Sequence, residues 1–513
     1  MSFAKVQSAQ TTLLDACIID VEVDLSGGLH AFSIVGLPDK AVEEARDRVS
    51  SAIKNSGFKS PKKKNEKVII SLAPADIKKE GSNFDLAIAL GYLLAAGDIR
   101  FNPLGKLFLG ELALDGHTRA ITGTLPLVRA AARAGFKEVY VPKENAREAA
   151  LIDGIAVYAV DTLSAVVAHL NEKSEKPKKL LAQPKTKVSL GVSFSSNDLS
   201  DIKGQESAKR GLEIAAAGAH NIAMYGPPGT GKTMLARAFA ALLPPLSFEQ
   251  MLEVTSIHSI AGTLKGELVT VPPFRSPHHT ASHISIVGGG TFPRPGEITL
   301  AHRGVLFLDE FPEFEHRVIE ALRQPLEDRS ISITRVKGTA AYPAHFILIA
   351  AMNPCPCGNY GTRKECICSP SNLLRYRRKV SGPIVDRIDM WVEVGTIEYK
   401  TLSDKTPRTE GSEKVRERIL AARKIQRARF ASAKLPYQTN SELSARDIDT
   451  HAGLSEPVRN LLNQSATKLG LSGRAYHRVI KLARTIADLE GNEKITEKNI
   501  LEALSYRPKQ LSS

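Results

Sequence analysis

The stretch GPPGTGKT at residues 226–233 constrains this chain more than any other feature of its sequence. It follows a short apolar run at residues 221–225 and precedes a run of good helix formers at residues 234–243. A strand, a glycine-rich loop and a helix in this order direct backbone N–H groups at phosphate oxygens. The loop consists of Gly226, Pro227, Pro228, Gly229, Thr230, Gly231, Lys232 and Thr233. We therefore expect an α/β domain that binds ATP, with Lys232 on the β- and γ-phosphates and Thr233 on Mg²⁺.

Two later apolar runs end in polar residues that suit the same chemistry. VLFLDE at residues 305–310 ends in Asp309 and Glu310, and ILIAAMN at residues 347–353 ends in Asn353. We expect Asp309 to hold Mg²⁺ through water, Glu310 to polarise the attacking water, and Asn353 to orient that water near the γ-phosphate. Taken alone, each run has an ordinary structural alternative, because buried strands often end in acids and Asn-Pro pairs form turns.

The composition indicates several folded parts. The 513 residues amount to about three typical domains. A hydrophobic content of 42% lets each part bury a core. Polar, proline-containing stretches at residues 171–190 and 398–412 are typical of linkers. They delimit an α/β part at residues 1–170, the phosphate-loop core at residues 191–397 and an arginine-rich helical part at residues 413–513.

Local patterns predict elements outside the phosphate loop. Apolar residues at helical spacing favour helices at residues 41–53, 84–95 and 472–489, and β-branched or apolar runs favour strands at residues 68–72, 138–141 and 155–160. No signal peptide is expected, because the N-terminus lacks an apolar segment. The longest apolar run, residues 86–97, is too short to span a membrane. We therefore expect a soluble cytoplasmic protein with no membrane partner.

The order of these motifs resembles the AAA+ ATPases. The resemblance implies a ring, usually a hexamer, with ATP at subunit interfaces and an arginine from the neighbouring subunit in each site. Residues 201–205, about 20 residues before the loop, fit the segment that packs on the adenine.

The resemblance also selects candidate arginines. GPIVDRID at residues 382–389 is similar to the segment that carries the arginine finger in the Mg-chelatase and MCM branch, which implies Arg387. An intrachain salt bridge with a neighbouring aspartate is the alternative for Arg387. In the helical part, Arg474 stands at a position that resembles sensor 2, with Arg478 as the alternative.

A narrower resemblance covers essentially the whole chain. Stretches similar to the YifB/ComM group of Mg-chelatase-like proteins include GLPD at residues 36–39, FRSPHH at 274–279, PRPGE at 293–297, LRQPLE at 322–327 and NPCPCG at 353–358. The resemblance implies a ring DNA helicase for branch migration, which promotes integration of single strands in homologous recombination and natural transformation. It implies single-stranded and branched DNA as partners, self-association as a hexameric ring, and recombination proteins as further candidates.

The first part resembles the C-terminal domain of Lon proteases, an S5-like α/β fold. That family's protease site needs a serine in a Gly-Pro-Ser-Ala-Gly setting and a lysine further on. Here the corresponding stretch, residues 80–85, reads EGSNFD and puts Asn83 at the nucleophile position, with Ser82 open if the register shifts by one. The expected role of this part is a scaffold that orders the ring or contacts DNA.

Four of the five cysteines, Cys355, Cys357, Cys366 and Cys368, lie within a single short loop. Four thiolates so close together suit a structural, tetrahedral Zn²⁺ site, although one residue within each pair is a shorter spacing than usual. Four reduced surface thiols are the alternative, and a disulfide suits a cytosolic protein less well. Three histidines, His278, His279 and His283, also cluster, for which hydrogen bonds or partner contacts are favoured over a metal.

Several basic segments are candidates for DNA contact. Residues 329–342 read as strand–turn–strand, and in the resembling helicases a hairpin here projects into the ring pore, so Arg335 and Lys337 would meet backbone phosphates. A glycine run at residues 288–290 is the other candidate pore loop. Residues 414–434 carry eight basic residues against one glutamate, a pattern equally typical of a solvated helix face. The net charge of +14 favours nucleic acid only modestly.

Three functions remain in competition. The leading one is an ATP-driven ring motor on DNA. The second is an Mg-chelatase-type ATPase subunit that remodels a protein partner, and the third is a Lon-like protease, which requires a Ser–Lys pair. Stimulation of ATP hydrolysis by single-stranded or forked DNA separates the first from the other two.

Overall fold

The computed structural model describes residues 3–12, 15–61, 65–172, 178–186, 198–264, 268–290, 294–335, 338–361, 364–397 and 410–508. Its chain forms two compact units, Met1–Ser189 with Met251–Val269, and Leu190–Gln250 with Thr270–Ser513. Most of the two predicted linkers, at residues 173–177, 187–190 and 398–409, lies outside the described residues. Residues 251–269 fall within the predicted phosphate-loop core in sequence, yet they pack with the first unit, where Leu252 is buried.

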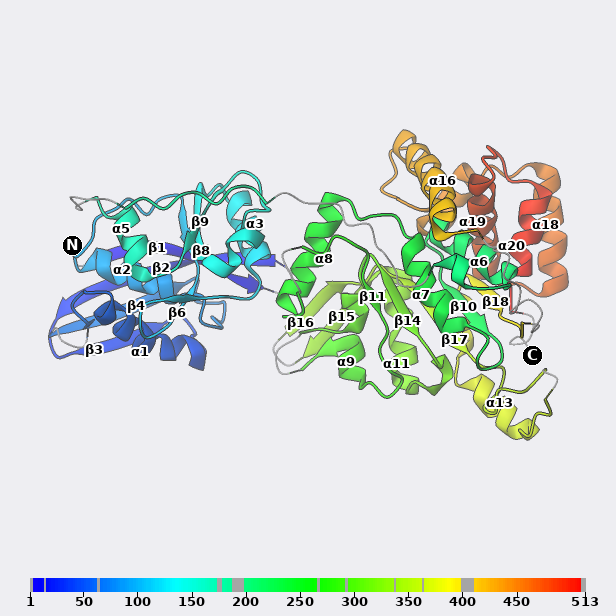
Figure 1. Cartoon of the computed structure of the whole chain (residues 1–513), viewed down its shortest axis with the longest axis horizontal. Coiled ribbons are helices and arrows are strands. Elements are labelled where there is room, and N and C mark those ends of the chain that lie inside the picture. The colour runs from blue at the N-terminus through cyan, green and yellow to red at the C-terminus, as the bar shows by residue number, and fades with distance from the viewer. Residues whose placement is uncertain are drawn as a thin grey trace. The chain divides into compact units, whose positions relative to one another are not determined.

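The first unit is built on a seven-stranded mixed sheet in the order β3-β4-β2-β1-β5-β8-β9 (Figure 1). Its strands are β1 (Phe3–Thr12), β2 (Asp15–Gly27), β3 (Ala31–Val35), β4 (Glu66–Ala73), β5 (Lys106–Phe108), β8 (Glu138–Pro142) and β9 (Ala156–Val160). Its helices are α1 (Lys40–Asn55), α2 (Asp85–Ala95), α3 (Thr124–Arg133), α4 (Ala146–Ala149) and α5 (Leu163–Leu170), and β6 (Glu111–Leu112) pairs with β7 (Thr118–Arg119). The helices and strands predicted from this part of the sequence are therefore confirmed.

Side-chain alternation along the strands gives this sheet two buried faces. In β8, Tyr140 joins the hydrophobic cluster that contains α1, α2 and α5. Its neighbours Val139 and Val141 join the other cluster, with α3, α4 and Leu252 of α8 (Phe248–Ile260). The sheet is thus packed on both faces at β8, whereas β3 and the start of β1 alternate between exposed and more buried residues, as in a sheet with one open face.

The second unit contains an entirely parallel five-stranded sheet in the order β11-β14-β17-β10-β18. Its strands are β11 (Phe274–Arg275), β14 (Val305–Leu308), β17 (Ile347–Met352), β10 (Ile222–Tyr225) and β18 (Met390–Glu393). Parallel alignment sets the carboxyl ends of β10, β14 and β17 along one edge. The phosphate loop, the Asp309–Glu310 pair and Asn353 follow these three ends, so the strand order brings the predicted motifs to the same edge.

Short helices and two hairpins surround this sheet. They are α6 (Glu206–Gly218), α7 (Lys232–Leu242), α9 (His283–Val287), α10 (Glu297–Leu300), α11 (His316–Ala321), α12 (Arg323–Asp328), α13 (Pro370–Arg378) and α14 (Gly382–Arg387). The hairpins are β12 (Gly288–Gly289) with β13 (Arg294–Pro295), and β15 (Ser330–Arg335) with β16 (Gly338–Pro343).

The C-terminal helices pack onto the same unit, and Figure 1 shows them in orange and red against α6. They are α16 (Ser412–Ser432), α17 (Ala445–His451), α18 (Glu456–Leu469), α19 (Gly473–Leu489) and α20 (Glu497–Ser505). Phe430, Ile486 and Ile500 share one hydrophobic core with the strands of the parallel sheet. The Trp391 amide donates a hydrogen bond to the Tyr506 carbonyl at 2.8 Å, which joins the end of the last helix to β18.

Candidate active site

The phosphate loop joins β10 to α7 at the carboxyl edge of the parallel sheet. Gly229 and Gly231 have φ values of +75° and +93°, a region that glycine adopts without strain. Gly226 is constrained by space instead, since a Cβ there would lie 2.0 Å from the Val394 carbonyl oxygen. These glycines let the backbone turn tightly at the N-terminus of α7, where its free N–H groups favour an anion.

Lys232 is buried at the base of the loop. Its Nζ donates hydrogen bonds to the carbonyl oxygens of Gly226 and Pro227, both at 2.8 Å, and to Asn353 Oδ1 at 3.2 Å. Burial lowers the pKa of Lys232, and the charge of Asp309 opposes that shift. The structure therefore brings the predicted phosphate lysine and the predicted water-orienting amide into direct contact.

The predicted magnesium residues also meet. Thr233 Oγ1 donates a hydrogen bond to Asp309 Oδ2 at 2.8 Å. The next residue, Glu310, has a φ of +51°, and its backbone N–H donates to Asp309 Oδ1 at 3.0 Å. Hydroxyl and carboxylate oxygens are the ligands that Mg²⁺ prefers, so Thr233 and Asp309 fit this ion.

A partner of Glu310 was missed by the sequence reasoning. His279 Nδ1 lies 2.9 Å from Glu310 Oε2, so the sequence pattern correctly favours polar contacts for these histidines but does not identify the partner. The contact exists because β11 and β14 are adjacent parallel strands, and the segments that follow them leave the sheet at the same edge. Recognition of the two-residue strand β11 would have been the signal, and a strand so short is hard to see in a sequence.

The segment predicted to lie on the adenine reaches the loop. Gln205, which precedes α6, donates from Nε2 to the Gly395 carbonyl at 2.6 Å and to the Thr230 carbonyl at 3.4 Å. It thereby connects the phosphate loop to the segment that follows β18. Contact with adenine itself stays a prediction.

The candidate arginines lie at the other edge of the sheet. The N–H groups of Asp389 and Met390, just after Arg387, donate to the carbonyl of Asn221, which immediately precedes β10. The phosphate loop follows the opposite end of β10, about 13 Å away for a four-residue strand. Arg387 is therefore separated from the phosphate loop of its own chain.

Glu327 contacts both Arg387, the candidate arginine finger, and Arg474, the candidate sensor-2 arginine. Arg387 Nη2 donates to Glu327 Oε2, and Arg387 Nη1 donates to the Pro383 carbonyl at 3.0 Å. Arg474 Nη2 lies 3.3 Å from Glu327 Oε1. The hydrogen bond from Arg387 is the main reason that the pKa of Glu327 falls below its ordinary value. The intrachain salt bridge weighed for Arg387 thus exists, but with Glu327 on α12 instead of a neighbouring aspartate.

Arg478, the alternative to Arg474, pairs with Asp389. The distance from Arg478 Nη1 to Asp389 Oδ1 is 3.6 Å, and His220 Nδ1 lies 3.7 Å from Asp389 Oδ2. Burial alone would raise the pKa of Asp389, but Arg478, His220 and the Asn221 N–H together hold it well below its usual range. Arg474 and Arg478 therefore both lie at the amino edge of the sheet, where Arg474 pairs with Glu327 and Arg478 pairs with Asp389.

The four loop cysteines converge. Their sulfur atoms all lie within 4.8 Å of one another, and in the described part of the chain they form the one group of histidine, cysteine or acidic residues placed to hold a metal. Sulfur–sulfur distances of 3.4 to 3.7 Å compare with about 3.8 Å for a tetrahedron with Zn–S bonds of 2.3 Å. Hydrogen bonds from the Asn359 backbone and from the other three cysteines lower the pKa of Cys357 to about 6, while the pKa values of Cys366 and Cys368 are raised, so the cluster favours a thiolate at Cys357. The cluster fits zinc.

This cysteine loop lies directly against the phosphate loop. A Cβ on Gly358 would come within 2.6 Å of Pro228 Cδ, and Gly358 has a φ of +78°. Tyr376 on α13 donates its hydroxyl to the Asn353 carbonyl at 3.3 Å. The conformation of the cysteine loop therefore affects the positions of the residues that would surround the phosphates.

The two candidate pore hairpins are neighbours. A Cβ on Gly288, in the first hairpin, would lie 2.9 Å from Ile333 Cδ1 in the second. The predicted strand–turn–strand is confirmed, with Arg335 opposite Gly338 at its end. Lys337 lies outside the described residues, and only the backbone of Arg335 is described, so their contact with DNA stays a prediction.

Asn83 and Ser82, the two candidates for the nucleophile position of a Lon-like protease, make other contacts. Asn83 Nδ2 donates to the Ala9 carbonyl at 2.6 Å, and the Ser82 hydroxyl donates to a carboxylate oxygen of Glu111. A serine nucleophile needs a base that accepts its proton. Among the described contacts of Ser82 and Asn83, a lysine is absent, so the geometry gives no support to a Ser–Lys dyad.

Three of the eight basic residues at residues 414–434 make contacts inside the second unit. On α16, Arg418 pairs with Glu213 at 2.6 Å, Arg429 pairs with Asp488, and Arg423 donates to the Ala216 carbonyl. These contacts fix the helix on the core. Within the described residues, we find no helix long and apolar enough to cross a membrane.

Comparisons with known proteins match every part of the chain. The family model described as magnesium chelatase, subunit ChlI, matches residues 198–402, the model for subunit ChlI of Mg-chelatase matches residues 21–145, and the ChlI C-terminal model matches residues 409–507. The competence protein ComM of Haemophilus influenzae is 44% identical over 99% of this chain and 98% of its own length. The protein YifB of Escherichia coli is 44% identical over 99% and 97%. The magnesium-chelatase 38 kDa subunit of Rhodobacter capsulatus is 28% identical over 30% of this chain and 49% of its own.

Proposed function

The chain belongs to the ComM/YifB family of magnesium-chelatase-like AAA+ ATPases, and we propose that it is an ATP-driven ring motor that remodels branched DNA. Membership in this family implies ATP and Mg²⁺. The motor activity, the ring and the DNA substrate are the proposal. The observation that carries it is the position of Arg387 at the amino edge of the sheet, away from the phosphate loop of its own chain.

The carboxyl edge supplies the hydrolytic residues. Lys232 neutralises phosphate charge, and Thr233 and Asp309 hold Mg²⁺, which when bound stabilises the charge on the phosphate oxygens. Glu310 accepts a proton from the attacking water, and His279 orients its carboxylate. Asn353, whose Oδ1 accepts a hydrogen bond from Lys232, positions that water relative to the γ-phosphate.

A site of this kind is incomplete within one chain. In phosphoryl transfer a guanidinium stabilises charge that develops in the transition state. Arg387 and Arg474 share Glu327 at the opposite edge, so a second copy must bring them to the nucleotide. A contact between the two opposite edges of successive copies is heterologous, and such contacts close into rings when the rotation permits. This argument supports a ring, and six is the number of copies that the resemblance to AAA+ ATPases implies.

The DNA substrate is proposed from the relatives and from the hairpins. The relative from Haemophilus influenzae is named a competence protein. In a ring, the two neighbouring hairpins would repeat around a pore. Arg335, the last residue of β15, and Lys337, two residues later in the sequence, would contact backbone phosphates. We propose branch migration that extends the integration of single strands in recombination and natural transformation.

A structural Zn²⁺ is part of the proposal. Cys355, Cys357, Cys366 and Cys368 would occupy all four positions, which leaves no open site for chemistry. When bound, the ion would cross-link the two ends of this loop. Because Gly358 lies on Pro228, the stiffened loop would support the phosphate loop.

The deciding experiment combines ATP hydrolysis with DNA remodelling. Purified wild-type protein is assayed without DNA, with single-stranded DNA and with forked DNA, and its branch-migration activity is compared with that of Lys232→Ala. We expect DNA to stimulate hydrolysis, and the variant to fail in both assays. Size measurement with a non-hydrolysable ATP analogue should show a shift from monomer toward hexamer. Hydrolysis that is indifferent to DNA, in a protein that leaves forks unchanged, would rule out the motor.

That negative outcome would favour the second candidate. The chain matches chelatase subunit models over three separate ranges, so a chelatase-type ATPase that remodels a protein partner shares the whole nucleotide site. Such a subunit would hydrolyse ATP through Lys232 and Arg387 and would respond to its protein partner instead of DNA.

A further inference from the structure

A second polar pocket lies in the same unit as the nucleotide site, but at the amino edge of the parallel sheet. Its floor is made by the starts of strands, with Gly304 before β14 and Ile347 at the beginning of β17. Its other wall is α16 and the segment around η5 (Asn440–Glu442). The cavity has a volume of about 70 Å³. The phosphate loop leaves the opposite edge, so this cavity is separate from the ATP site.

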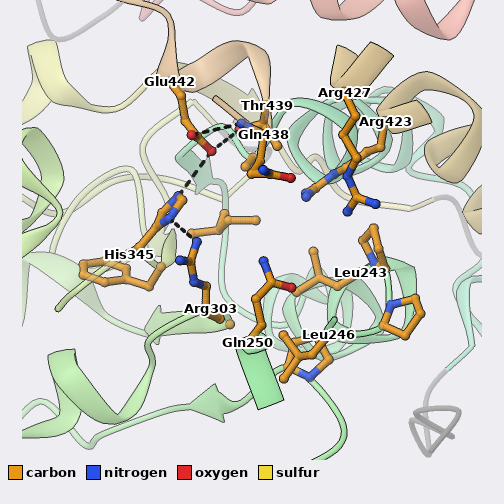
Figure 2. A pocket seen from close by; sticks show the side chains of 17 residues that line it. Leu243, Leu246, Gln250, Arg303, His345, Arg423, Arg427, Gln438, Thr439 and Glu442 are labelled. Carbon is orange, nitrogen blue, oxygen red and sulfur yellow. Dashed lines mark hydrogen bonds and ion pairs between the residues drawn. The ribbon is translucent and has the colours of Figure 1, made fainter. Parts of the chain in front are cut away.

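The polar lining of this pocket is dominated by arginine. Figure 2 shows Arg423 and Arg427 extending from α16 toward the open space, with Arg303 and His345 on the facing wall. The amide of Gln250 lies between the two walls. Three guanidinium groups therefore face one small cavity from two sides.

The one acidic residue of the lining is already occupied. Glu442 accepts hydrogen bonds from the Gln438 N–H at 3.1 Å and the Thr439 hydroxyl at 3.0 Å. Arg329, which is outside the lining, pairs with Glu442 at 3.3 Å. The single negative charge of Glu442 is thus shared between Arg329 and the lining, where it also acts on Arg423, and it cannot balance three arginines.

His345 adds no compensating negative charge and is itself neutral. Its Nδ1 lies 2.9 Å from Arg303 Nη1, so Nδ1 accepts and the ring proton is on Nε2. Burial and the nearby charges of Arg329 and Arg303 lower the pKa of His345 to about 2. The imidazole therefore acts as an acceptor that fixes the direction of Arg303.

The arginines on α16 have few acceptors of their own. Arg423 donates from Nε and Nη2 to the single carbonyl of Ala216, at 3.1 and 2.6 Å. Across the described residues, Arg427 makes neither a hydrogen bond nor an ion pair, and it lies close enough to Arg423 for the two charges to repel. Like charges around a cavity are stabilised by an anion that enters it.

We propose that this pocket binds a phosphate group. A tetrahedral oxyanion accepts two hydrogen bonds from one guanidinium, and arginine is the residue best matched to that geometry. A cavity of about 70 Å³ has room for one such group. The bound group would bridge Arg303 on the sheet edge to Arg423 and Arg427 on α16, and so would tie the helical segment to the core.

Two sources can supply such a phosphate group: free phosphate and the backbone of a nucleic acid. The experiment uses full-length protein with its phosphate loop filled by a non-hydrolysable ATP analogue, so that added phosphate cannot bind there. Binding of inorganic phosphate is measured by calorimetry at constant ionic strength. Binding of a single-stranded oligonucleotide, with and without competing phosphate, is measured by fluorescence anisotropy.

Arg427→Gln is the test variant, and Lys424→Gln is its control. Both residues lie exposed on α16 and both changes remove one positive charge, but Lys424 does not line the pocket. Arg427→Gln should weaken phosphate binding about tenfold, the effect of one lost charge-assisted hydrogen bond. Lys424→Gln should leave it unchanged, and unaltered melting of both variants without phosphate excludes a folding defect.

The outcomes separate the sources and test the pocket. If Arg427→Gln weakens phosphate and oligonucleotide together, and phosphate competes with the oligonucleotide, the occupant is a nucleic-acid phosphate. If it weakens phosphate alone, the occupant is free phosphate. The proposal is overturned if wild-type protein binds no phosphate at millimolar concentration, or if the two variants lose affinity equally.

Discussion

Thr233 Oγ1 donates a hydrogen bond to Asp309 Oδ2 over 2.8 Å, which joins the first turn of α7 to the end of β14. The two oxygens are ligands of the kind that Mg²⁺ requires, and they come from separate motifs in the sequence. The contact therefore defines where the metal of Mg-ATP would lie relative to the phosphate loop.

Thr233→Val removes this hydroxyl and keeps the side-chain shape. We expect ATPase activity to fall about 10- to 100-fold, as it does when a metal site loses a supporting oxygen. Thr233→Ser, which restores the hydroxyl, is the control and should recover most of the activity. Steady-state hydrolysis over a range of Mg²⁺ concentrations measures the effect, and equal activity of the valine and serine variants would contradict it.

His279 should act by orienting Glu310. His279→Ala removes the contact of 2.9 Å and leaves the carboxylate without this partner. We expect kcat to fall roughly tenfold, a part of what a positioned general base contributes. The KM for ATP should change little, because the described contacts of His279 are with His278, Glu310 and Phe314 and not with the phosphate loop. His279→Gln keeps a polar partner and should recover activity; a rise in KM with unchanged kcat would instead indicate a binding role.

Arg387 should act on a nucleotide held by another copy. Arg387→Ala and Lys232→Ala should each be inactive alone, because one lacks the arginine and the other lacks the phosphate lysine. Mixed in equal amounts, they should regain about a quarter of wild-type ATPase if the interfaces act independently. In about a quarter of the interfaces, a chain with an intact Lys232 meets a neighbour with an intact Arg387. Hydrolysis by the remixed rings is the measurement. A mixture that stays inactive would place Arg387 in the site of its own chain.

The cysteine loop should carry zinc. Elemental analysis of purified protein is expected to find about one zinc per chain, and Cys357→Ser should lose it because a structural site needs all four ligands. Wild-type protein free of metal would leave the four residues as reduced thiols.

A neighbouring glycine tests whether this loop supports the phosphate loop. Gly358→Ala would place a Cβ 2.6 Å from Pro228 Cδ, so we expect the KM for ATP to rise. Gly361→Ala is the matched control, because Gly361 has a similar φ of +74° but no described atom lies within 4 Å of an added Cβ. Backbone strain is then common to both variants, and only the clash with Pro228 differs. An equal rise in KM in both variants would show that strain alone is responsible.

Asp389 should make the second unit sensitive to acid. Its folded-state pKa is depressed below the ordinary value of about 3.9, so its stabilising contribution is present above that pH and is lost as pH falls toward the folded pKa. Asp389→Asn should lower the free energy of unfolding at pH 7 on the order of 2 kcal/mol, by removing the charge that Arg478 and His220 face. Denaturant titrations at several pH values should show this difference shrinking below about pH 4. A difference independent of pH would assign the loss to packing.

Much of the nucleotide site was predictable because its residues are contiguous. A loop, a lysine and a hydroxyl in eight successive residues specify one local geometry, and Asp309 and Asn353 each follow an apolar run long enough to recognise. The helices and strands of the first unit were predictable for the same reason, since their periodicity is local. By contrast, β11 has two residues, and no local pattern distinguishes such a strand from a loop.

The sequence by itself determined the chemistry of the phosphate loop, the acids that follow it and the four clustered thiols, because each depends on residues close together in the chain. Only the tertiary structure decided which distant residues meet. Glu327 and Arg387 are 60 residues apart, and they touch because α12 and α14 pack at the amino edge of the sheet. His279 reaches Glu310 through the pairing of β11 with β14, and three arginines surround one cavity through the packing of α16 on the core. Strand order and helix packing set these distances, and neither is written in the spacing of residues along the chain.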